Sequence, residues 1–170
     1  MSVATETREG YQRSLAADIL RSGGSVRLQA LGTSMLPSIW PGDLLVIKSN
    51  PGEHVTIGDI ALVVGEGRFF VHRVVGQGEE QGQVRWITRG DALSEDDPSV
   101  RATELLGRVS LIHRNGRVMI PSRKPSLLQL ALGWMLRHCA SFRSLALRAH
   151  TMRCKAAPAD DVWPALEQNF

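Results

Sequence analysis

Residues 26–47 read VRLQALGTSMLPSIWPGDLLVI, and they predict two β-strands joined by a stiff polar loop. Apolar and polar residues alternate over 26–31, which is the period of a half-buried strand. The run that starts at Leu44 is apolar throughout. Two prolines and a Gly-Asp turn between the strands leave the backbone few alternatives. Ser34 in this loop is therefore held in one geometry, as a nucleophile must be, although an ordinary turn between two strands would have the same composition.

Short strand patterns continue along most of the chain. With 26–31 and 44–48 they make seven predicted strands, the others being 60–64, 68–75, 84–88, 106–113 and 118–120. Turn-rich steps separate them, among them Gly76-Gln77-Gly78 and Asn115-Gly116. Asn115-Gly116 is the strongest hairpin signal, because apolar runs flank it. Strands at this spacing predict a mainly β fold with a closed or nearly closed antiparallel architecture.

Helical patterns precede and follow the strands. Residues 7–21 suit an amphipathic helix that ends at Gly23-Gly24, with one apolar side formed by Tyr11, Leu15, Ala16, Ile19 and Leu20. After Pro125, apolar residues from Leu127 to Met152 recur every three or four positions, which predicts a helical tail. The expected organisation is a β domain over 1–122 and a tail over 123–170 with a loosely held end.

The basic charge of the chain belongs to this tail. Residues 123–155 contain seven Lys or Arg and no acid, whereas the rest of the 170 residues has 13 basic and 17 acidic side chains. The whole protein is therefore not expected to bind nucleic acid specifically. The tail helix either packs on the β domain with a solvated basic face, or it lies on an anionic membrane surface or a protein partner.

Targeting and metal-binding signals are weak. The N-terminal residues are polar, and the longest apolar run, 127–136, is too short to span a bilayer. We therefore expect a cytoplasmic protein, with peripheral membrane contact through the tail as the alternative. Cys139 and Cys154 with His138 and His150 match no familiar metal spacing, so no metal or cofactor is predicted.

Two further regions carry residues that suit acyl transfer. His72 interrupts an apolar strand, and residues 90–98 form an acidic loop. Each has an ordinary explanation when taken alone. His72 could be a hydrogen-bonded polar group in a strand, and the acidic loop could be a surface turn. Taken together with Ser34, however, they offer a nucleophile, a base and an orienting carboxylate, for which Asp97 is the candidate.

Three sequence blocks, in order and over about residues 26–113, carry a family resemblance. They are Ser34-Met35-Leu36-Pro37 through Pro41-Gly42-Asp43, then Gly58-Asp59-Ile60 with Val71-His72-Arg73-Val74, then Gly90-Asp91 through Asp96-Asp97. This combination resembles the signal peptidase I superfamily of serine proteases, which also contains the LexA-type self-cleaving proteins. The resemblance implies a mostly β protease fold in which Ser34 attacks the peptide carbonyl.

The resemblance also assigns the other site residues. Most bacterial members use lysine as general base, but His72 stands at the matching position, as in the endoplasmic-reticulum and archaeal signal peptidases. A neutral imidazole accepts the serine proton directly, whereas a lysine must first be desolvated. By the same match Asp97 orients His72 and Asp91 braces the site, with Asp96 as the competing acid.

The chain departs from the family pattern in two ways. Signal peptidases often carry a serine two residues before the nucleophile, as an oxyanion-hole donor, but this chain has Gly32 there. The oxyanion region is then Gly32, Thr33 and Ser34, where the Ser34 backbone N–H is available and a second donor is in doubt. Loss of one such donor costs about 10²–10³ in rate. The second departure is that no membrane anchor is predicted.

The sequence thus predicts a serine endopeptidase of signal-peptidase type. The resemblance implies that it binds an extended peptide as an added strand beside residues 28–33 and 69–71 and cleaves a protein or peptide precursor after small residues. One alternative is a non-catalytic peptide-binding module with the same fold. A LexA-like self-cleaving regulator is less expected, because the 33 residues before Ser34 contain no helix-turn-helix pattern.

Overall fold

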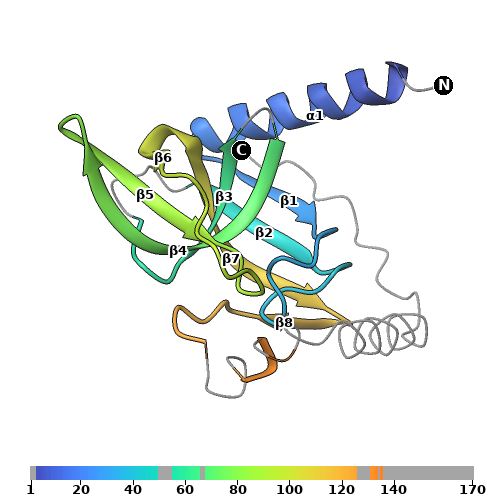
Figure 1. Ribbon diagram of the computed structural model, residues 1–170. Helices are drawn as coiled ribbons and strands as arrows, with labels where there is room; N and C mark the ends of the chain where they lie inside the picture. Colours follow the sequence, from blue (N-terminus) through green and yellow to red (C-terminus); the bar gives the residue numbers. More distant parts are fainter. Residues whose placement is uncertain (1–2, 50–54, 66–67, 126–130, 134, 136–170) are drawn as a thin grey trace.

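The computed structural model describes residues 3–49, 55–65, 68–125, 131–133 and 135, and it is mainly β (Figure 1). The elements in chain order are α1 (Val3–Arg21), β1 (Ser25–Gln29), β2 (Leu44–Ser49), β3 (Ile60–Gly65), β4 (Arg68–Glu80), β5 (Gln83–Arg89), β6 (Val100–Arg101), the 3₁₀ turn η2 (Ala102–Glu104), β7 (Leu105–Arg114) and β8 (Arg117–Met119). A short helical turn also covers residues 131–133.

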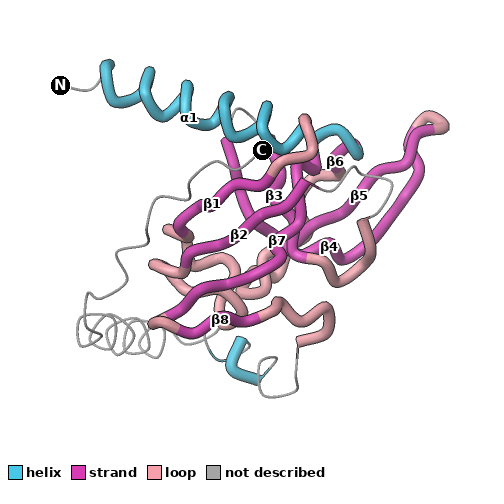
Figure 2. Tube along the Cα trace, turned by 180° about the vertical axis from the view of Figure 1, so that it is seen from behind, coloured by secondary structure: helices cyan, strands magenta, loops and turns pink. Residues whose placement is uncertain are grey.

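The strands form one eight-stranded antiparallel sheet. Their order is β1-β2-β7-β3-β4-β5-β6, and β8 pairs with β7. The sheet is strongly twisted, and the β4–β5 hairpin extends away from the rest of the molecule (Figure 2). The predicted antiparallel β architecture is confirmed. The sheet is not closed, because no pairing within the described residues joins the end strands β1 and β6.

The predicted strands are all present, but β4 is longer than predicted. It continues to Glu80 through Gly76-Gln77-Gly78, so the turn predicted at those residues is wrong. A register shift between Val74 and Gly76 bends the strand there without ending it, as a β-bulge does. The chain instead reverses at Gln81 and Gly82, where both φ angles are positive (53° and 73°). The two-residue strand β6 was not predicted.

The turn at Asn115-Gly116 was predicted correctly. It joins β7 to β8, with Arg114 paired to Arg117 and φ angles of 48° and 72° at the two turn residues. Such angles are typical of the tight turn that the Asn-Gly pair favours.

Helix α1 is confirmed and ends before Gly23, but its buried side differs from the prediction. Tyr11, Leu15 and Ile19 are exposed, and the side that packs on the sheet consists of Ala16, Ala17 and Leu20. These three lie within four residues of one another and so share one helical face. Because the two alanines are small, the helix can lie close to β1, β2 and β7, which it contacts.

The main core cluster also holds the loop that carries Ser34. Met35 and Ile39 of this loop are buried with Leu45 and Ile47 of β2 and with Leu20 of α1. The segment after Ser34 is therefore part of the hydrophobic core and has little freedom to move. No helix in the described part of the chain is long and apolar enough to cross a membrane. Most of the predicted tail helix lies outside the described residues.

Candidate active site

The structure brings Ser34, His72 and Asp97 into one hydrogen-bonded chain. His72 Nε2 lies 3.0 Å from Ser34 Oγ, and His72 Nδ1 lies 2.6 Å from Asp97 Oδ2. The residues come from the loop after β1, from β4 and from the loop after β5. We call residues 30–43 the nucleophile loop and residues 90–99 the acid loop. Since these three side chains are far apart in sequence, the fold itself assembles the arrangement.

Asp43 anchors the nucleophile loop at its far end. Its carboxylate is buried, accepts the backbone N–H of Trp40 at 2.8 Å, and is paired with Arg114 of β7 at 2.8 and 2.6 Å. Gly42 has a φ of 93°, a region that glycine adopts without strain. The Pro-Gly-Asp part of the first sequence block therefore fixes the loop on the sheet.

Thr88 at the end of β5 fixes the acid. Its hydroxyl donates to Asp97 Oδ2 at 2.7 Å, and its backbone carbonyl accepts the Asp97 N–H at 2.8 Å. Thr88 is fully buried, so these bonds are shielded from water. Sequence reasoning did not find Thr88, because it looks like any other residue at the end of a predicted strand.

The other two aspartates have different partners. Asp96 Oδ1 lies 3.2 Å from Arg89 Nη1, and both side chains are substantially exposed. Asp91 accepts two bonds from Arg73, at 2.8 and 2.7 Å, and one from the Ser38 hydroxyl. Only Asp97 therefore meets the His72 ring, while Asp91 lies in a separate network beside it.

His72 is nearly buried, and both of its ring nitrogens are engaged. Phe70 packs against the imidazole edge-on, with the ring centroids 5.1 Å apart and an interplanar angle of 61°. This contact limits rotation of the imidazole, since an aromatic neighbour occupies one side of it. The ring is thus held between Ser34, Asp97 and Phe70.

Gly90, at the start of the acid loop, packs directly on the Ser34–His72 pair. A Cβ atom at Gly90 would lie 2.7 Å from the Ser34 carbonyl oxygen and 3.1 Å from His72 Nε2. The Ala92 N–H, two residues further along the acid loop, donates a hydrogen bond of 2.8 Å to the same Ser34 carbonyl oxygen. Only glycine fits without displacing the nucleophile, a requirement that sequence reasoning missed.

Replacing Gly90 with alanine is expected to lower the reactivity of Ser34 toward a fluorophosphonate serine probe by about 10²-fold, because the added methyl group must shift the pair by a substantial part of an ångström. The measurement is the rate constant of labelling, with the thermal unfolding midpoint recorded for the same sample. Gly78→Ala is the matched control, since nothing lies within 4 Å of a Cβ atom there. A folded Gly90→Ala protein that is labelled as fast as the wild type would contradict this account.

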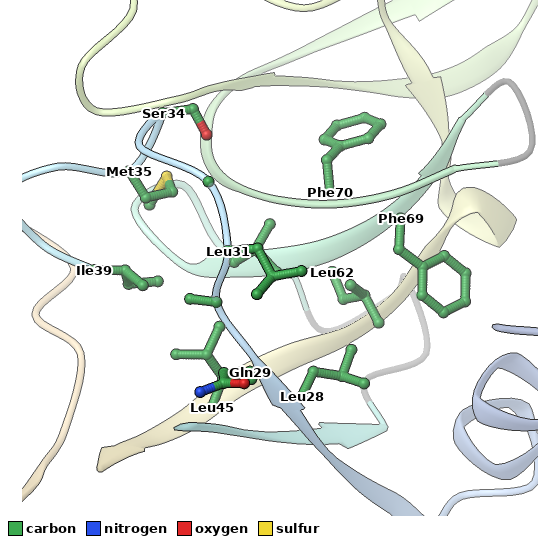
Figure 3. A pocket seen from close by; sticks show the side chains of 13 residues that line it. Leu28, Gln29, Leu31, Ser34, Met35, Ile39, Leu45, Leu62, Phe69 and Phe70 are labelled. Carbon is green, nitrogen blue, oxygen red and sulfur yellow. The ribbon is translucent and has the colours of Figure 1, made fainter. Parts of the chain in front are cut away.

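An apolar pocket opens beside Ser34. Its volume is about 360 Å³, and it is lined by Leu28, Gln29, Ala30, Leu31, Gly32, Ser34, Met35, Ile39, Leu45, Leu62, Phe69, Phe70 and Val71. Figure 3 shows Ser34 at one end, with Phe69 and Phe70 on one side and Met35 and Ile39 on the other. The pocket thus lies between the β1 side of the molecule and the first part of β4.

Both strands that border the pocket have an unpaired edge within the described residues. β1 pairs with β2 alone, and residues 68–72 of β4 pair with β3 alone because β5 pairs with β4 only from Arg73 onward. Unpaired strand edges offer backbone N–H and C=O groups to another chain.

In the oxyanion region, Gly32 is exposed and lines the pocket, and Thr33 is partly buried. Nothing lies within 4 Å of a Cβ atom at Gly32, so a serine there would fit without moving a neighbour. The Thr33 carbonyl accepts the Leu36 N–H at 3.3 Å, within the nucleophile loop itself.

In the part of the chain that the structure describes, no three His, Cys, Asp or Glu side chains come together in a way that could hold a metal ion. The four tail residues considered above, His138, Cys139, His150 and Cys154, lie outside that part.

The family described as Peptidase S24-like matches residues 1–109, which include all three sequence blocks and the Ser34–His72–Asp97 chain. No curated protein matches the chain. The matched region extends from α1 into β7 and covers more than half of the sequence. The chain therefore belongs to the peptidase S24-like family.

Proposed function

We propose that the protein is a serine endopeptidase in which Ser34 is the nucleophile, His72 the general base and Asp97 the orienting acid. The observation that carries this proposal is the unbroken hydrogen-bonded chain from Ser34 Oγ through the imidazole to Asp97 Oδ2. Membership of a serine peptidase family supports the same class of reaction.

The geometry suits the two steps of acyl transfer. With a proton on Nδ1, the imidazole donates to Asp97 and its Nε2 accepts the Ser34 proton as Oγ attacks the peptide carbonyl carbon. The protonated ring then gives this proton to the departing amine, which leaves an ester on Ser34. Water attacks the ester while His72 takes one of its protons. His72 then gives this proton to Ser34 Oγ as the carboxylic acid leaves, which restores the serine hydroxyl and the neutral imidazole.

The substrate is proposed to bind as an extended strand between β1 and β4. The unpaired edges on each side of the pocket would supply backbone hydrogen bonds, and alternate side chains of the peptide would point into the pocket. Because the lining is mostly apolar, the residues placed there are expected to be apolar and uncharged. The family resemblance adds a preference for small residues next to the cleaved bond.

The finer parts of the assignment rest on the resemblance. We propose a signal-peptidase-type enzyme closest to the Ser-His-Asp members of the endoplasmic reticulum and archaea, which cleaves a protein or peptide precursor. A cytoplasmic location and a membrane or protein contact through the basic tail, residues 123–155, remain predictions. No specific nucleic-acid partner is proposed.

Labelling with a fluorophosphonate probe tests this function. The wild-type protein is expected to gain one covalent adduct, located by peptide mass spectrometry on Ser34, because the Ser34 Oγ lies 3.0 Å from His72 Nε2, the nitrogen that would take its proton. Ser34→Ala should gain none, while Ser94→Ala, which removes an exposed serine of the acid loop, should be labelled like the wild type.

The same samples separate the rival functions. A folded wild-type protein that is never labelled would indicate a non-catalytic peptide-binding module. Time-dependent cleavage of the wild-type chain incubated alone, with Ser34→Ala remaining intact, would instead indicate a self-cleaving regulator of the LexA kind.

A further inference from the structure

Arg73, which follows His72 on β4, uses every one of its N–H donors. Nε and Nη2 bind the two oxygens of Asp91 at 2.8 and 2.7 Å, and Nη2 also binds Ser38 Oγ at 3.2 Å. Nη1 donates to the carbonyls of Gly58 and Ser122, both at 2.8 Å. The guanidinium has five donors, and all five are satisfied at a nearly buried position.

These bonds connect Arg73 to both loops that carry the reacting side chains. Ser38 belongs to the nucleophile loop and Asp91 to the acid loop, and their side chains are also bonded to each other. The loops meet again where the Ala92 N–H binds the Ser34 carbonyl at 2.8 Å. A shift of Asp91 would therefore move the backbone of Ser34.

The remaining bonds lead to the chain that follows β8. We call residues 120–125 the post-β8 segment. Besides the Ser122 carbonyl on Arg73, this segment places Arg123 Nε 2.7 Å from Asp59 Oδ1. Asp59 is buried, whereas Arg123 is about half exposed. A Cβ atom at Gly58 would lie 2.6 Å from the Arg123 carbonyl oxygen, so the segment rests directly on the backbone there.

The helical turn at 131–133 contacts both the nucleophile loop and the acid loop. Gly133 is buried, and a Cβ atom there would lie 3.5 Å from Pro37 Cδ and 3.7 Å from the Asp91 carbonyl oxygen. Pro37 lies in the nucleophile loop, three residues after Ser34. Residues beyond the predicted boundary at 122 thus contact both catalytic loops.

We propose that the post-β8 segment holds the catalytic loops in register through Arg73, so that Ser122 and Arg123 are positioning residues of the active site. This inference rests on the proposed function. If the segment leaves, Arg73 Nη1 loses a partner in a buried place, and a buried donor without a partner is costly. Arg73 would then relax toward other acceptors, and the Asp91–Ser38 contact that aligns Ser34 would shift.

The test replaces Arg123, whose side chain binds Asp59, with a negatively charged residue in the full-length chain. Arg123→Glu sets a carboxylate against buried Asp59 and should release the segment. We expect the labelling rate constant of Ser34, and kcat for a peptide substrate, to fall by about tenfold or more, since small misplacements of reacting groups have large effects on rate. KM should change little, because no post-β8 residue lines the pocket.

Two variants serve as controls. Lys124→Glu makes the same charge change one residue further along, at an exposed side chain, and should keep the wild-type rate. Arg123→Lys keeps a cation near Asp59 and should restore most of the activity. Thermal unfolding is measured for every variant, and Arg123→Gln, which removes the charge without repulsion, replaces Arg123→Glu if the latter does not fold.

Each outcome bears on one claim. A folded Arg123→Glu or Arg123→Gln protein that keeps the wild-type rate constant overturns this inference but not the proposed function. A loss of activity that is no larger than the loss of folded protein has the same consequence. An equal loss in Lys124→Glu also overturns it, since the effect would then be one of general charge. If the wild type itself is not labelled on Ser34, the proposed function fails first.

Discussion

The variant His72→Ala is expected to lose Ser34 reactivity by at least about 10²–10⁴-fold, the range that a positioned general base contributes. The reason is geometric, because His72 Nε2 is the group 3.0 Å from the nucleophilic oxygen and a methyl group cannot accept its proton. The measurement is the rate constant of phosphonylation, together with kcat for a cleaved peptide once one is known.

Two further variants keep this test from being a test of folding. His72→Gln retains an amide that can hydrogen-bond Asp97 but cannot serve as a base, so it should be folded and equally slow. His113→Ala removes a partly buried histidine of β7 and should leave the rate near that of the wild type. Substantial reactivity in folded His72→Gln would sink the assignment of His72 as the base.

The second large effect is expected for Asp97→Asn, which should lower turnover by orders of magnitude, up to the about 10⁴-fold that the equivalent change causes in serine-protease triads. An asparagine at this position cannot hold the imidazole in the tautomer that accepts the serine proton. Nor can its neutral side chain stabilise the imidazolium that forms during attack. Rates of labelling and of peptide cleavage measure the loss, and stability should change little because Asn is isosteric with Asp.

Asp96→Asn is the matched control, since it makes the same chemical change one residue earlier. The Asp96–Arg89 pair is substantially exposed, and such pairs contribute at most about 1 kcal/mol. The rates of labelling and of peptide cleavage by Asp96→Asn should therefore stay near the wild-type values. A larger loss in Asp96→Asn than in Asp97→Asn would reverse the assignment, and wild-type rates in both would leave a Ser34–His72 dyad without an acid.

Much of the fold could be predicted from residue patterns. Alternation over 26–31, apolar runs such as 44–48 and the Asn115-Gly116 turn depend on side-chain direction and local backbone preference, which short segments determine. The predictions failed where packing decided the outcome. Gly76 looked like a turn but lies at a bulge inside β4, and Tyr11, Leu15 and Ile19 look like a core face but are exposed.

The candidate site was predicted only in part. The residue types Ser34, His72 and Asp97 were selected from three blocks and a family resemblance, and the structure brings these three together. Thr88 lies outside these blocks, and Ser38 and Gly90 lie within them but were given no role. A threonine that ends a strand or a glycine in a loop has many ordinary uses, and nothing local marks the one that touches an active site.

By itself, then, the sequence determined the antiparallel β class and the chemical groups available for catalysis, because period-two patterning and side-chain chemistry are local properties. Tertiary structure alone decided which groups meet. It turned Asp97 toward His72 and Asp96 toward Arg89, it placed the Ser122 carbonyl on Arg73, and it brought Gly133, from beyond the predicted boundary at 122, to the catalytic loops. The physical reason is that hydrogen bonds and close packing between distant segments depend on positions within fractions of an ångström, which only the assembled core specifies.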